Sequence, residues 1–118
     1  MCLLKQDLVY EIMTSKLENT VVFEMSQGYF AKFVIVTSAD SVRQISGIST
    51  KILETLKKKG YYDITIIGPA DGGWVLVDCI DVVLHMFSNE ARAQYKIEEL
   101  LEVNAKKIER LEDLSNGP

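Results

Sequence analysis

The fold is decided by residues 73–87, GWVLVDCIDVVLHMF, which hold the only tryptophan and the only histidine of the chain. Two apolar, β-branched runs flank Cys79 and Ile80, and this pattern predicts a β-hairpin with a two-residue loop at those positions. Pairing outward from that loop places Trp74 directly opposite His85.

Alternation along the strands gives this hairpin two unlike faces. One face is apolar and is expected to pack on the core: Val75, Val77, Val82, Leu84 and Met86. The other is mixed: Trp74, Leu76, Asp78, Asp81, Val83, His85 and Phe87. Because a few large aromatic anchors carry most of the energy of an interface, the mixed face is a candidate partner-binding surface. A core role for Trp74 and a structural role for His85 are the alternatives.

The remaining elements follow from periodicity and capping signals. Helical spacing of apolar residues predicts a first helix over residues 3–17, and β-branched runs predict strands over 20–25, 31–38 and 63–68. Ser41 and Gln44 have capping-box spacing at the start of a second helix, which is expected to end near Gly60. Ser88 is expected to cap a third helix running through Leu101.

This order, α-β-β-α-β-β-β-α, predicts one α/β or α+β domain with a mixed sheet of about five strands flanked by helices. We expect the domain to span residues 1–102. Residues 103–118 are expected to form a charged C-terminal extension that is partly helical, because apolar residues recur there at weaker helical spacing: Ile108, Leu111 and Leu114.

Composition narrows the class of protein. The 118 residues, 47% hydrophobic and 25% charged, fit one globular domain, and no apolar run approaches the roughly 18 residues that cross a bilayer. The N-terminus lacks the features of a secretory or transit signal, so a cytoplasmic location is expected. A net charge of −4 argues against nucleic-acid capture and favours a basic protein partner.

The sequence offers little material for catalysis. Asp78 and Asp81 are candidates for a carboxylate pair, but carboxylates that flank a turn more often serve the turn itself. The glycine-rich residues 68–73 lack the lysine of a phosphate loop and lead into a strand. The single histidine and two distant cysteines predict no metal site and no disulfide framework. We therefore predict no catalytic residue, metal or cofactor, with a nucleotide-handling enzyme as the alternative.

Four segments resemble, in order and spacing, the ribosomal silencing factor family, also called RsfS or Iojap-like. They are residues 29–44, the Trp-Val-Leu-Val-Asp run at 74–78, the Asp-Val-Val-Leu-His run at 81–85, and residues 92–100 with Arg92 and Tyr95. The similarity covers roughly Leu4 to Leu101. Family members commonly carry glycine where Ile80 stands.

The resemblance implies a nucleotidyltransferase-like fold without catalytic residues. It also implies binding to the large ribosomal subunit through its universal protein fourteen, which would block joining of the small subunit and repress translation under nutrient limitation. A homodimer is expected in the free state, and a factor for large-subunit assembly is an alternative function. The expected partner-binding residues are Trp74, Leu76, Asp78, Val83, His85, Phe87, Arg92 and Tyr95.

Overall fold

The structure is a computed structural model that describes residues 3–68, 70–108, 110–111 and 113–114. A six-stranded mixed sheet with the strand order β3-β4-β5-β2-β1-β6 forms its centre. The strands are β1 (Glu18–Met25), β2 (Phe33–Ala39), β3 (Thr65–Ile67), β4 (Trp74–Asp78), β5 (Val82–Ser88) and β6 (Ala105–Ile108). Strands β2 and β5 pair in parallel and the other neighbours are antiparallel, so the predicted α+β class with a mixed sheet is confirmed.

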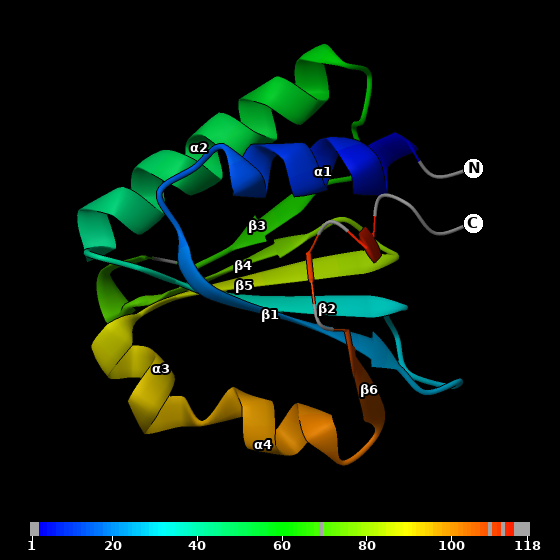
Figure 1. The fold of residues 1–118 in the computed structure, drawn as a ribbon. Coiled ribbons are helices and arrows are strands. Elements are labelled where there is room, and N and C mark those ends of the chain that lie inside the picture. Colours follow the sequence, from blue (N-terminus) through cyan, green and yellow to red (C-terminus); the bar gives the residue numbers. More distant parts are fainter. Residues whose placement is uncertain (1–2, 69, 109, 112, 115–118) are drawn as a thin grey trace.

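Helices cover both faces of this sheet (Figure 1). One face carries α1 (Leu3–Met13) and α2 (Val42–Lys58). The opposite face carries α3 (Asn89–Tyr95) and α4 (Ile97–Glu102), and a short 3₁₀ turn, η1 (Ala70–Gly72), precedes β4. The alternating strands therefore bury side chains on both sides, as two separate clusters.

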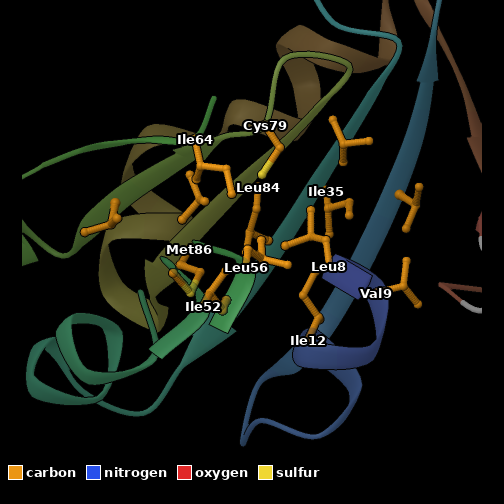
Figure 2. Packing of buried hydrophobic residues seen from close by; sticks show 14 of the residues in the cluster. Leu8, Val9, Ile12, Ile35, Ile52, Leu56, Ile64, Cys79, Leu84 and Met86 are labelled. Carbon is orange, nitrogen blue, oxygen red and sulfur yellow. The ribbon is translucent and has the colours of Figure 1, made fainter. Parts of the chain in front are cut away.

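The larger cluster lies beneath α1 and α2 (Figure 2). Leu8 and Ile12 of α1, with Ile52 and Leu56 of α2, pack on sheet residues that include Leu84. The face of the hairpin predicted to meet the core is the one that faces this cluster: Val75, Val77, Val82, Leu84 and Met86. The helix α2 begins as predicted, because the Ser41 hydroxyl accepts a 3.1 Å hydrogen bond from the amide of Gln44.

The register of the hairpin differs from the prediction by two residues. Trp74 lies opposite Phe87 and Leu76 opposite His85, so the loop is Ile80 and Asp81 rather than Cys79 and Ile80. The Asp81 amide donates to the Cys79 carbonyl at 2.9 Å, which closes a γ-turn around Ile80 at φ +70°. A shift of two residues preserves the alternation, so the strand residues keep their predicted faces, whereas Asp81 moves from the mixed face into the loop.

The chain beyond Tyr95 also differs from the prediction. Lys96 adopts φ +49° and divides the expected single helix into α3 and α4. Residues 105–108, expected to be part of a helical extension, form the sixth strand by pairing with β1. The local pattern of Lys106 and Lys107 carries no strong strand signal, so this strand depends on the long-range pairing. Leu114 is buried in the cluster beneath α1 and α2. The expected end of the domain at residue 102 stays a prediction.

Candidate partner-binding site

The site lies where β4 begins and β5 ends, beside the first turn of α3. Gly73 fixes this corner, because its carbonyl accepts a 2.8 Å hydrogen bond from the Ser88 amide and its φ is +84°. A Cβ on Gly73 would approach the Ser88 hydroxyl to 2.7 Å. The Ser88 hydroxyl also caps α3 by accepting from the Ala91 amide at 3.1 Å, as the sequence predicted. This corner therefore sets the position of Trp74 at the start of β4.

Four rings gather at this corner, and we call them the aromatic cluster: Trp74, His85, Phe87 and Tyr95. The Trp74 centroid lies 5.3 Å from those of Phe87 and Tyr95 and 5.7 Å from that of His85. Phe87 is fully buried, whereas 36% of Trp74 and 48% of Tyr95 are exposed. The cluster thus presents two large aromatic surfaces to solvent from a packed base, which limits the entropy lost when a partner binds.

The hydrogen bond between Trp74 and His85 holds the indole in place. The Trp74 Nε1 donates to His85 Nδ1 at 3.1 Å. An indole nitrogen can only donate, so Nδ1 must be unprotonated and the neutral imidazole carries its proton on Nε2. Burial lowers the pKa of His85 to about 4, which keeps the ring neutral at physiological pH. The role of His85 in the free protein is therefore to orient Trp74.

Arg92 connects the helices over this face to the sheet. Its Nε lies 2.8 Å from Glu98 Oε1 of α4, and its Nη1 donates to the Ser38 hydroxyl at the end of β2, also at 2.8 Å. The Arg92 guanidinium also lowers the pKa of the Glu98 carboxyl below its usual value. This bridge fixes the position of α3, and hence of Tyr95 on its last turn.

A groove of about 330 Å³ runs beside the exposed rings. It is lined by Ile67, Gly68, Asp71, Gly72, Trp74, Leu76 and Tyr95. The groove exists because α3 and α4 lie mainly over β5, β2, β1 and β6, so the helices cover the β3 and β4 side of this face only partly. Ile67 is consequently 53% exposed. The groove can therefore receive an apolar side chain from a partner. The carboxylate of Asp71 is among the groups that line it.

The structure brings five of the eight predicted residues together: Trp74, Leu76, His85, Phe87 and Tyr95. Arg92 supports them through the bridge to Ser38 and Glu98. Val83 and Phe87 are fully buried in the cluster beneath α3 and α4, so in this structure they support the surface without offering contact area. Asp78 lies at the far end of β4, where its carboxylate accepts from the Ile80 amide at 2.9 Å. That contact agrees with a turn role for this carboxylate.

Sequence reasoning missed four members of the groove, of which Ile67 and Asp71 have side chains beyond a hydrogen and the other two are Gly68 and Gly72. The sequence around these residues gave only a weak indication of a site, because it shows an apolar strand end followed by a glycine-rich turn. Ile67 reaches the site because β3 pairs with β4, which places it opposite Leu76, and Asp71 lies in η1 between these two strands. Among the described residues, no three His, Cys, Asp or Glu side chains lie close enough to hold a metal ion. No helix in the described part of the chain is long and apolar enough to span a membrane.

Comparison with known proteins identifies the family. The family model described as "Ribosomal silencing factor during starvation" matches residues 5–117. The ribosomal silencing factor RsfS of Zymomonas mobilis is 24% identical over 100 residues, which cover 80% of this chain and 75% of that protein. A crystal structure of a Chromobacterium violaceum protein aligns with a TM-score of 0.74 at 29% identity, over 84% of this chain and 83% of the other. A Bacillus halodurans structure aligns with a TM-score of 0.74 at 26% identity, over 89% and 95%. The chain therefore belongs to the ribosomal silencing factor family.

Proposed function

We propose that this protein binds the large ribosomal subunit through universal protein fourteen, sterically blocks joining of the small subunit, and thereby represses translation under nutrient limitation. The observation that carries the proposal is the exposed, pre-ordered pair Trp74 and Tyr95 beside an apolar groove, in a chain of the ribosomal silencing factor family. Blocking by occupancy requires a surface and no reacting group, so the protein acts as a non-enzymatic factor without a cofactor.

The geometry of the aromatic cluster supports a role in binding. Interface anchors are enriched in tryptophan and tyrosine, and they bind best when their rotamers are already fixed. Trp74 is held by His85 through a hydrogen bond and by Phe87 through stacking at 5.3 Å. Tyr95 packs against Trp74, with the ring centroids 5.3 Å apart, and lines the same groove. Both rings therefore keep their positions before a partner arrives.

Electrostatics support a basic protein as the partner. The chain carries 17 acidic and 13 basic side chains, which favours a basic surface over the phosphates of ribosomal RNA. Among the described residues that line the groove, the only charged side chain is the carboxylate of Asp71. A ribosomal protein that presents apolar and basic side chains together fits both features, and such a complex would place this protein in the cytoplasm.

The test is occupancy of the large subunit and its effect on subunit joining. Purified protein should co-sediment with large subunits, and its addition before small subunits should reduce assembled ribosomes in a sucrose gradient without nucleotide. Inhibition should rise in step with bound protein and saturate near one copy per subunit. Inhibition far below that ratio would indicate catalysis, and binding without any effect on joining would indicate an assembly factor; either result overturns the blocking mechanism.

A further inference from the structure

We propose that the partner contributes an extended segment that pairs with β3 as an added strand, placing an apolar side chain in the groove and a Lys or Arg side chain against Asp71. This inference rests on the proposed function and specifies how the same site recognises its partner. Three observations support it: β3 is an edge strand, a row of side chains across the sheet ends at Ile67 on this strand, and the groove carries a carboxylate.

Strand β3 ends the sheet and differs from the opposite edge. Alternate residues of an edge strand direct backbone N–H and C=O groups away from the sheet, and proteins commonly protect such edges with lysine. The other edge, β6, has this protection, since Lys106 and Lys107 are both exposed. The three residues of β3 are Thr65, Ile66 and Ile67, none of them charged. The β3 edge is therefore the one suited to pairing with another chain.

The register of the sheet leads directly to the groove. Ile67 lies opposite Leu76, Leu76 opposite His85, and His85 beside Val36, so these residues form one row across four strands. The row is buried at Val36 and His85, half-buried at Leu76 and exposed at Ile67. A strand added beside β3 would extend the row by one position. Its apolar side chain would then cover Ile67 at the groove.

The charge of the groove indicates which side chains the added strand should carry. Asp71 lines the groove, and Asp63, exposed two residues before β3, places a second carboxylate near the start of this strand. The residues lining the groove include no Lys or Arg among those the structure describes. Lys or Arg next to an apolar residue in the incoming segment would complement these carboxylates. Phosphate groups would be repelled, which disfavours a nucleic-acid strand.

The proposal is tested by amide hydrogen exchange on the full chain, alone and with the isolated universal protein fourteen of the large subunit. Strand addition should slow exchange within residues 65–67 at least tenfold, whereas the β6 amides at 105–108 should be unchanged. Binding that protects the Trp74 region but leaves residues 65–67 unchanged overturns the added strand while leaving the proposed function intact. Failure to bind the partner removes both proposals. Concentration-dependent protection of residues 65–67 in the protein alone would assign the edge to a second copy and also overturn the inference.

A pair of edge variants gives an independent readout. Thr65→Lys places a cation on the exposed β3 edge, as Lys106 does on β6, and should weaken partner binding at least tenfold by repelling the basic segment. Lys106→Thr makes the reverse change on the other edge and should alter affinity less than twofold. Both positions are exposed, so circular dichroism spectra should match the parent protein. Equal affinity for Thr65→Lys and the parent would contradict pairing at β3.

Discussion

Trp74→Ala tests the aromatic cluster most directly, and its effect on binding can be estimated from the structure. An exposed fraction of 36%, applied to the roughly 250 Å² that a tryptophan can bury, leaves about 90 Å² available to a partner. At about 25 cal/mol per Å², covering this area contributes about 2 kcal/mol, or about thirtyfold in Kd. Isothermal titration with the isolated ribosomal protein should measure a loss of that size.

The same substitution also removes contacts within the protein. The buried part of the ring packs on His85, Phe87 and Tyr95, so the free energy of unfolding should fall by about 3 kcal/mol, within the usual range for truncating large aromatic residues. Affinity must therefore be measured at a temperature where circular dichroism shows the variant to be folded.

Phe30→Ala is the matched control for affinity. Phe30 is an exposed aromatic residue between β1 and β2. The register places the start of β2 beside Val82 and Trp74 beside Phe87, at opposite ends of β5. Its truncation should change Kd less than twofold. A folded Trp74→Ala protein that binds as tightly as the parent would refute the assignment of the surface. A variant that cannot fold at any temperature would place Trp74 in the core instead.

Three further predictions address the site. Lowering the pH from 6.5 to 4 should reduce the free energy of unfolding by about 3 kcal/mol through His85, because its pKa of about 4 in the folded protein is below that in the unfolded chain, which takes up the proton first. In denaturant titrations the free energy of unfolding of His85→Asn should change less steeply with pH, and equal slopes would contradict this role. Gly73→Ala should lower stability by about 1–3 kcal/mol in thermal melts, because its φ is +84° and the new Cβ would crowd Ser88, whereas Gly47→Ala, with open space at its Cβ, should not destabilise. Raising salt should slow association with the partner more than it speeds dissociation in surface plasmon resonance, since charge mainly governs the encounter; a salt effect confined to dissociation would reverse that assignment.

Local patterns were sufficient for much of the fold. The apolar spacing of α2 and the hydroxyls of Ser41 and Ser88 act within a few residues, so the structure confirms both caps. The two faces of the hairpin were also predictable, because alternation depends only on the period of a strand. Its register was not, since that depends on which residue adopts the positive φ of the turn. That residue is Ile80, and a β-branched residue is not expected at a positive φ.

The sequence by itself determined the α+β class, the aromatic and ionisable face of the hairpin and, through its motifs, the family. Tertiary structure decided which members of that face are accessible, because α3 and α4 bury Phe87 and Val83 but leave Trp74 and Tyr95 partly exposed. It also brought Ile67 and Asp71 to the groove and made residues 105–108 an edge strand. The sixth strand arises from pairing between segments far apart in sequence, and the buried face from helices that pack on the sheet. The free energy of each contact depends on both partners at once. No local window of sequence contains that information.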